Sequence, residues 1–527
     1  MEMSGTYDCD VMIAGAGPVG LALALELGLR QIPCVVVEKR DGALHVPKMS
    51  VVSTRSMEFC RRWGIADEVR SAVWDRSRRL DFVYVENLKG RELARLGIPS
   101  YRDRDPDRPT PEPSAHCPQI FFDPILGRRA RREKSLTFMY NSTLDGFEQD
   151  VEGVTAVVAT EGQTRKIRAR YLVGCDGATG YVRDALGVKL EGLGAIADSV
   201  NLFFRAPQLI DLHDKGWARI YRLIDETGCW SELIPIDGKE TWRLTVFDEP
   251  QAAVDPDKYL RRMLGDGFTF EMINISAWER KDFVAETFRK GRVFIAGDAA
   301  HQCSPTGGIG MATGIEEAVN LAWKLDAALK GWAGPRLLDS YTAERHKIAQ
   351  RTVDLSTRAY KNIASIPGWR HGGDVDGDAT LEEWRGHLDR YTIPDHVKMQ
   401  YTYENSPICA LDGTPAPDPE PKIFAPSSRP GSRAPHVWLA DGKAIFDLFD
   451  EGFTLLRLGA NAPSGEGLLK AARARGLPIH SAHVVDAEAL EIYSKPLVLI
   501  RPDGHVAWRG DSEPTDPLAI IDLIRGA

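Results

Sequence analysis

The 527-residue sequence has no apolar run of the ~18 residues that a membrane-spanning helix needs. It also lacks a basic N-terminal segment followed by a short apolar one, so no export signal is predicted. Positive charge is not in excess, because the net charge is −9 and the pI is near 5.8. This balance disfavours nucleic acid and anionic membrane surfaces as partners. We therefore expect a cytoplasmic protein that binds neither.

Paired cysteines are also missing. The eight cysteines stand singly, without a CxxC motif, and none lies beyond Cys409. A dithiol redox site and a cysteine-rich zinc site are thereby excluded, and reduced thiols are expected. The histidines show no metal-ligand spacing, so no metal site is predicted. We interpret His301 as a structural residue.

A nucleotide-binding pattern occupies residues 11–39, which read VMIAGAGPVGLALALELGLRQIPCVVVEK. An apolar strand leads into glycines and an apolar helix, and a second strand ends at Glu38. The glycines let backbone N–H groups approach a pyrophosphate, and the acid can accept hydrogen bonds from an adenosine ribose. Because Glu38 would repel a 2′-phosphate, the pocket suits FAD or NAD. The residues assigned to it are Gly15, Gly17, Pro18, Gly20, Glu38 and Lys39.

Two further motifs follow apolar strands. YLVGCDGATGYVR contains Asp176, and GRVFIAGDAAHQCSPTGGIGMATG contains Gly297 and Asp298. Together with the first motif, and in this order, they resemble the class A flavoprotein aromatic hydroxylases, which have the para-hydroxybenzoate hydroxylase fold. The resemblance covers about residues 8–365 and favours FAD as the bound nucleotide.

The resemblance implies roles for individual residues. Asp298 would hold the ribityl chain of FAD, Asp176 would belong to a motif associated with FAD and NAD(P)H, and Gln119 would contact FAD. Lys48 stands where the family usually has arginine, so its phosphate contact would be a point charge rather than a fork. The glycine-rich loop after Asp298 would face the isoalloxazine ring. The further FAD contacts implied there are Gly297, Pro305, Gly308, Gly310, Met311 and Ala312.

This loop also has a physical rationale. Pro305 stiffens it, and Gly307, Gly308 and Gly310 leave room for a flat ring. A helix that begins near Gly314 would direct its N–H groups and its dipole into the loop. Such an N-terminus would stabilise the negative charge that a reduced flavin carries around N1 and C2=O.

The order of elements predicts an α/β protein. The resemblance implies that it combines an FAD-binding Rossmann-like domain of the glutathione reductase type, an inserted mixed β-sheet substrate domain and a C-terminal domain. The stretch RPDGHVAWRG (501–510) resembles the thioredoxin-like domain of phenol and polyketide hydroxylases. Without redox cysteines, that domain would serve packing or dimer formation. The predicted segments are 1–75, 111–188 and 286–370 for FAD binding, 76–110 and 189–285 for the substrate domain, 371–415 for a helical linker, and 416–527 for the thioredoxin-like domain.

Strand alternation offers candidates for the substrate pocket. Arg219, Tyr221 and Leu223 should share a face, as should Trp230, Glu232 and Ile234. Tyr221 resembles the family tyrosine that bonds the substrate phenol, and such a bond would make the ring a better nucleophile by lowering the phenol pKa. Alternatively, Tyr221 and Trp230 are ordinary sheet aromatics. The predicted substrate contacts are Tyr221, Trp230, Glu232 and Pro305, of which Tyr221 and Pro305 are assigned to catalysis.

The predicted function is that of an FAD-dependent monooxygenase. By resemblance, NADH or NADPH reduces the flavin, O2 forms a C4a-hydroperoxyflavin, and a phenolic or polyketide aromatic substrate is hydroxylated. One alternative is Baeyer–Villiger oxygenation of a polyketide ketone. Another, of a different class, is a flavin-binding protein without turnover. A homodimer is also predicted.

Overall fold

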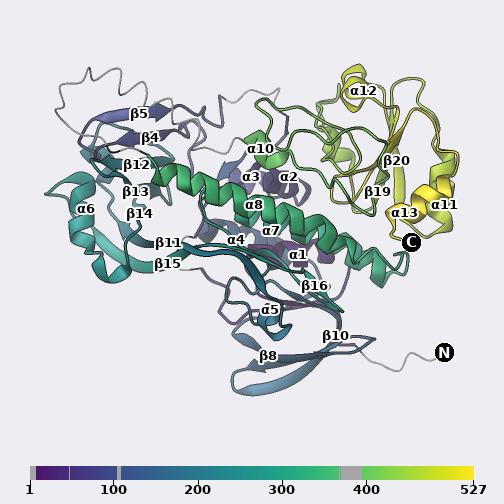
Figure 1. Ribbon diagram of the computed structural model, residues 1–527, viewed down its shortest axis with the longest axis horizontal. Helices are drawn as coiled ribbons and strands as arrows, with labels where there is room; N and C mark the ends of the chain where they lie inside the picture. Colours follow the sequence, from purple (N-terminus) through teal and green to yellow (C-terminus); the bar gives the residue numbers. More distant parts are fainter. Residues whose placement is uncertain (1–6, 45, 47, 104–108, 367, 369–394) are drawn as a thin grey trace.

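The computed structural model describes residues 7–44, 46, 48–103, 109–366, 368 and 395–527 (Figure 1). Two eight-stranded sheets and one four-stranded sheet dominate it. Within these described ranges, no helix is long and apolar enough to cross a membrane, and no group of His, Cys, Asp or Glu could hold a metal ion. All eight cysteines are free.

The first sheet is built around parallel strands. β1 (Cys9–Ala14) lies between β2 (Cys34–Val37) and β10 (Gln163–Gly174). β2 is apolar along its length, and β1 is apolar except for Asp10; both are almost fully buried, as is typical of parallel strands. The order is β16 (Arg289–Lys290), β17 (Val293–Ile295), β10, β1, β2 and β7 (Leu136–Met139), with β8 (Ser142–Gln149) and β9 (Val154–Thr160) paired onto β10.

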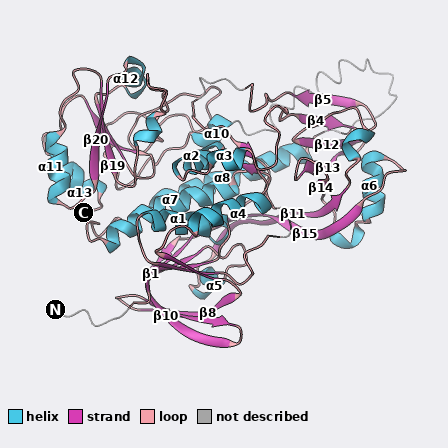
Figure 2. Ribbon diagram, turned by 180° about the vertical axis from the view of Figure 1, so that it is seen from behind, coloured by secondary structure: helices cyan, strands magenta, loops and turns pink. Residues whose placement is uncertain are grey.

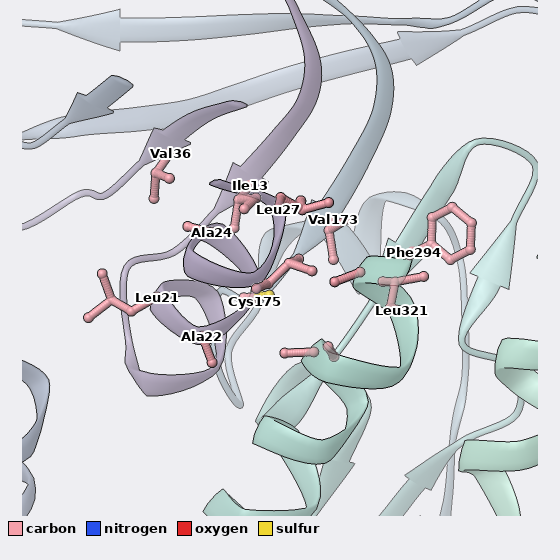
Figure 3. Packing of buried hydrophobic residues seen from close by; sticks show 14 of the residues in the cluster. Ile13, Leu21, Ala22, Ala24, Leu27, Val36, Val173, Cys175, Phe294 and Leu321 are labelled. Carbon is pink, nitrogen blue, oxygen red and sulfur yellow. The ribbon is translucent and has the colours of Figure 1, made fainter. Parts of the chain in front are cut away.

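Helices α1 (Pro18–Leu29) and α7 (Gly310–Leu329) pack against each other and against this sheet. Figure 3 shows Ala24 and Leu27 of α1 close to Ile13 of β1 and Val173 of β10, with Leu321 of α7 nearby. All five side chains are fully buried. This packing fixes where the N-termini of α1 and α7 lie relative to the strand ends.

The second sheet belongs to the predicted substrate domain. Its two longest strands, β11 (Leu190–Arg205) and β15 (Glu271–Ala285), form a ribbon that reaches from the first sheet into the second (Figures 1 and 2). Residues 76–110 contribute β4 and β5 to it. The order is β18 (His301–Gln302), β15, β11, β14 (Thr241–Phe247), β13 (Gly228–Pro235), β12 (Ile220–Asp225), β4 (Phe82–Val85) and β5 (Glu92–Leu96).

One face of the second sheet is an apolar core. Tyr221, Leu233, Leu244 and Leu202 face one another across four strands in register. They belong to a buried cluster that includes residues of α6 (Pro256–Leu264). The opposite face therefore turns toward the nucleotide-binding elements.

The C-terminal domain is an α/β layer with a sheet of its own. Its sheet order is β20 (Ile479–Val484), β19 (Phe453–Leu458), β21 (Leu497–Ile500) and β22 (Val506–Gly510), in which only the β19–β20 pair is parallel. Its helices are α11 (Glu466–Ala474), α12 (Ala487–Tyr493) and α13 (Pro517–Ile524). Trp323 of α7, Trp332 and Phe453 share one buried cluster, so this domain and the nucleotide domain have a common core.

Buried charges join the C-terminal domain to α8 (Ser340–Ala364), the long helix that runs between the second sheet and this domain (Figure 1). Arg501 donates to both carboxylate oxygens of Glu344, at 2.6 and 2.9 Å, and to Asp503 at 2.6 Å. Lys324 of α7 also donates to Glu344, at 2.7 Å. Burial opposes ionisation of Glu344, but Arg501 and Lys324 hold its pKa below the ordinary value. The RPDGH stretch is thus the internal anchor of the domain.

Shorter elements complete the chain. They are β3 (Val51–Val52), β6 (Ala115–His116), α2 (Thr54–Arg62), α3 (Ala66–Arg70), α4 (Gln119–Ala130), α5 (Tyr181–Ala185) and α10 (Asp395–Met399). The 3-10 helices are η1 (Leu209–Leu212), η2 (Gln251–Ala253), η3 (Gly297–Ala299) and η5 (Ile445–Leu448). Most of the predicted helical linker 371–415, namely residues 371–394, lies outside the described residues.

Candidate active site

A cavity of about 1750 Å³ lies between the nucleotide-binding elements and the polar face of the second sheet. It brings together most of the residues that the sequence pointed to. Those that line it are Gly15, Gly17, Pro18, Glu38, Lys39, Lys48, Gln119, Asp176, Glu232, Asp298, Pro305, Gly308, Gly310 and Met311. Gly20 and Gly297 are buried against neighbouring backbone and side chains, and Ala312 borders a separate void of about 20 Å³.

The glycine turn after β1 is shaped to leave its outer side open. A Cβ on Gly15, whose φ is +102°, would lie 2.4 Å from the carbonyl oxygen of Cys175, and one on Gly20 would lie 2.0 Å from that of Gly15. A Cβ on Gly17, in contrast, would meet nothing within 4 Å. Gly17 precedes α1, which has no side-chain cap, so its first N–H groups can bind an anion. This arrangement fits a pyrophosphate.

Glu38 supports this turn directly. One carboxylate oxygen accepts a hydrogen bond from the Ala16 N–H at 2.8 Å, and the other accepts one from the Arg40 N–H at 2.9 Å. The carboxylate therefore orients the turn while lining the cavity, where it remains available to a ribose.

Buried side chains hold the Gly297–Asp298 motif in place. The Gly297 N–H donates to Glu317 at 2.8 Å, and the other oxygen of Glu317 lies 3.2 Å from His301. Burial opposes protonation of His301, but Glu317 raises the His301 pKa to about 10. The His301 and Glu317 side chains are fully buried, which agrees with a structural role for His301. Asp298 itself is exposed to the cavity.

The loop 305–309 ends at the N-terminus of α7. This helix begins at Gly310, four residues earlier than predicted, and has no side-chain cap. Pro305, Gly308 and Met311 line the cavity around it. Uncapped N–H groups and the positive end of a 20-residue helix suit a group that becomes anionic on reduction.

A buried carboxyl adjoins the predicted FAD contacts on α4. Gln119 donates to one oxygen of Asp123 at 2.9 Å, while the other oxygen has no partner. Burial raises the pKa of Asp123 to about 7, although the hydrogen bond from Gln119 opposes this shift. Asp123 lines the cavity and was not identified from the sequence.

Asp123 predicts a pH-dependent stability. The pKa of Asp123 is higher in the folded than in the unfolded protein. The stability that Asp123 contributes is therefore fully present below about pH 4 and is lost as pH rises through about 7. Asp123→Asn, which stays neutral, should gain thermal stability relative to wild type between pH 5 and pH 8. Thermal unfolding of both proteins at matched FAD content measures this. Parallel pH profiles would contradict the prediction.

The cavity face of the second sheet carries a row of polar residues. Arg222, Glu232, Thr245, Asn201 and Ser276 pair in register across five adjacent strands, and all line the cavity. Thr245 donates to Asn201 at 2.9 Å. Polar groups on a buried sheet face are costly unless they are partnered, so such a row marks a binding surface.

Arg280 links this sheet to the flavin-facing loop. It donates to Ser304 at 3.1 Å and to Thr306 at 3.2 Å, the residues on either side of Pro305. Its guanidinium also lies 4.7 Å from the ring centroid of Trp278. Arg280 thus fixes the spacing between the sheet and the loop.

The predicted roles of Tyr221 and Trp230 are wrong in this fold. Tyr221 is fully buried in the apolar core, where its hydroxyl donates to the Gly216 carbonyl and accepts from the Ala218 N–H at 3.0 Å. Trp230 belongs to the same core. The cause is a β-bulge: Leu223 pairs with Ser231 and Ile224 with Cys229, so Trp230 is the extra residue. The alternation of side chains between the two faces of the sheet is therefore broken between Trp230 and Glu232.

Tyr221→Phe should accordingly destabilise the protein without uncoupling it. The substitution leaves the buried N–H of Ala218 without this partner and removes the hydrogen bond to the Gly216 carbonyl, which costs about 1–3 kcal/mol. Denaturant unfolding measures the loss, and peroxide release during turnover should match wild type. Increased peroxide at unchanged stability would restore the catalytic assignment.

Three arginines of the second sheet that line the cavity were missed: Arg222, Arg243 and Arg280. The available signal was a basic residue inside an otherwise apolar strand, as in IYRLI and TWRLTVF. Such residues need a polar environment when the strand is buried.

The class of protein follows from this geometry and from comparison. Residues 8–356 match the family described as FAD binding domain, and residues 427–521 match the family described as aromatic-ring hydroxylase, C-terminal. The chain therefore belongs to the class A FAD-dependent aromatic-ring hydroxylases. It is an FAD-dependent monooxygenase that acts on aromatic or polyketide substrates, and NAD(P)H is the reductant typical of its family.

Individual relatives match nearly the whole chain. The FAD-dependent monooxygenase apdD of Emericella nidulans is 32% identical over 95% of this chain and 87% of its own. The structure of RebC with bound 7-carboxy-K252c is 35% identical, covers 99% of this chain and 100% of its own, and has a TM-score of 0.91. The ternary complex of aklavinone-11 hydroxylase with FAD and aklavinone is 27% identical over 99% and 100%, with a TM-score of 0.84.

Proposed function

We propose that the protein hydroxylates a phenolic ring, with NADH or NADPH as reductant and O2 as oxidant. The observation that carries this proposal is one continuous cavity. Its walls combine the open glycine turn, the uncapped end of α7 and the polar row of the second sheet. A nucleotide cofactor and an aromatic substrate can therefore meet at the loop around Pro305.

Bound FAD would supply the redox and oxygen chemistry. The chain would supply its placement: N–H groups at Gly17 and α1 for the pyrophosphate, Glu38 for the adenosine ribose, and Asp298 for the ribityl chain. Lys48 would add a positive charge near the phosphates, and Gln119 and Asp176 would complete the contacts. Two N-terminal residues of α7, Gly310 and Met311, would stabilise negative charge on the ring.

The substrate contacts proposed from the sequence change in part. Pro305 and Glu232 line the cavity and are retained. Glu232 is half-buried, and it can accept a hydrogen bond from a polar substituent of the substrate. Tyr221 and Trp230 are replaced by residues of the polar row. The relatives with bound 7-carboxy-K252c and aklavinone support a polycyclic aromatic substrate.

The alternatives differ in support. A flavin-binding protein without turnover is not retained, because the relatives are enzymes. Baeyer–Villiger oxygenation uses the same cavity and adds the same mass.

A homodimer and a thioredoxin-like C-terminal fold remain part of the proposal. The fold is supported by a parallel β19–β20 pair joined through α11, followed by an antiparallel hairpin.

A substrate screen tests the proposal. Oxygen uptake by the FAD-loaded protein with NADH and with NADPH would be measured against phenols from monocyclic to polycyclic, and released peroxide would be counted separately. At least one phenol should stimulate uptake and yield a ring-hydroxylated product by NMR. A lactone or ester product would instead establish the Baeyer–Villiger reaction.

A further inference from the structure

We infer that the natural substrate carries a carboxylate, which Arg222 binds at the end of the cavity remote from Pro305. This inference rests on the proposed function, since it names the substrate class for the same site. It is drawn from the charge, burial and register of the second sheet.

The cavity face of this sheet is strongly cationic. Among the cavity-lining residues at or within β12, β13 and β14, Arg219, Arg222 and Arg243 are opposed by one acid, Glu232. Arg280 adds a fourth guanidinium from β15. The neighbouring Lys281 and Glu279 lie 3.7 Å apart and largely offset each other. A buried surface with this excess of positive charge favours an anionic ligand.

Arg222 is the best-placed of these cations. It is 4% exposed, and it donates from one terminal nitrogen to the Tyr84 hydroxyl at 2.9 Å. Its Nε has no hydrogen-bond partner in the described part of the chain. Although Arg222 and Glu232 pair in register, no ion pair joins them within the described residues. The guanidinium is thus held by a neutral group and retains donors for a ligand.

A carboxylate matches what this arginine offers. A guanidinium presents parallel N–H groups whose geometry fits the two oxygens of a planar carboxylate. Glu232 attracts Arg222 without forming an ion pair with it, so a bound carboxylate would add opposite charge to a buried surface on which guanidinium groups outnumber acids. Thr245 and Asn201, which follow Glu232 in the polar row, add neutral polar groups beside the site.

The register places this site far from the reacting centre. Arg280 on β15 contacts both neighbours of Pro305, whereas Arg222 lies on β12. The strands β11, β14 and β13 separate them, which is four spacings of about 4.8 Å, or roughly 19 Å between strand axes. A substrate that spans this distance has its acid and its reacting ring at opposite ends.

A matched pair of probes tests the inference. The FAD-loaded protein would be titrated with 6-hydroxy-2-naphthoic acid and with 6-hydroxy-2-naphthamide. Isothermal titration calorimetry would give each Kd, because a probe of this length held at Arg222 does not reach the flavin-facing loop. We expect the acid to bind about 10–100-fold more tightly than the amide. Arg222→Gln should bring this ratio to about 1–3 while FAD content stays at the wild-type level, and Arg222→Lys should retain part of the acid preference.

A control arginine lies on the same sheet. Arg205 is half-exposed and pairs with Glu240, outside the cavity, so Arg205→Gln should preserve the full acid preference. Equal binding of acid and amide by wild type would overturn the inference without any variant. An acid preference that survives Arg222→Gln would overturn the assignment to Arg222.

Failure of the inference and failure of the proposed function give different results. If neutral phenols bind as tightly as acids and stimulate oxygen uptake and hydroxylation, the function stands and the anion site is wrong. If the acid binds selectively but no phenol stimulates oxygen uptake, the anion site stands and the function is wrong.

Discussion

Replacing Arg501 with alanine is expected to lower the free energy of unfolding by about 3–5 kcal/mol. The substitution leaves Glu344 and Asp503 buried without the cation that bonds to both. Lys324 cannot compensate both carboxylates, because its ion pair among the described residues is with Glu344. Denaturant unfolding followed by circular dichroism measures the loss.

The control for Arg501 is an exposed ion pair in the same domain. Arg475 pairs with Asp522 at 2.8 Å, and both are partly exposed. Arg475→Ala should cost less than about 1 kcal/mol, since surface pairs contribute little. Equal losses for the two variants would show that the buried network does not anchor the domain.

Asp298→Ala is expected to weaken FAD binding by about 10–100-fold while the protein stays folded. Asp298 faces the cavity, and a charge-assisted hydrogen bond to a ligand hydroxyl would be lost. The motif itself is held by Glu317 rather than by Asp298, so the local backbone should persist. Flavin absorbance of the purified protein and titration of FAD into the stripped protein provide the measurement.

Asp339→Ala is a suitable comparison, because Asp339 is an exposed partner of Arg289 and does not line the cavity. It should retain FAD. An Asp298→Ala variant with full flavin occupancy would move the ribityl contact elsewhere in the cavity wall.

The nucleotide-binding half could be predicted from sequence because its constraints are local. Gly15 and Gly20 must lack a Cβ, and both can be recognised in the sequence because they belong to one strand–turn–helix pattern. Glu38 directly follows the adjacent strand β2, so its position relative to the glycine turn is fixed by the same unit. Pro305 and Gly308 lie shortly before a helix whose apolar residues recur at helical spacing, and this pattern located the loop.

The substrate face could not be predicted in the same way because it depends on non-local pairing. Alternation assigned Tyr221 and Trp230 to the cavity, but the bulge at Trp230 moves that residue onto the apolar face. Arg222 and Glu232 become a site only when β12 and β13 align in register. Likewise, the RPDGH stretch was recognised by resemblance, whereas its role depends on Glu344, 157 residues earlier.

Incorporation of oxygen-18 tests the central claim most directly. The FAD-loaded protein would be supplied with NAD(P)H, labelled O2 and a phenol that stimulates oxygen uptake, and the product would be analysed by mass spectrometry and NMR. We predict one labelled oxygen atom on the aromatic ring for each NAD(P)H oxidised. Label found only in peroxide or water, with the phenol unchanged, would contradict the account.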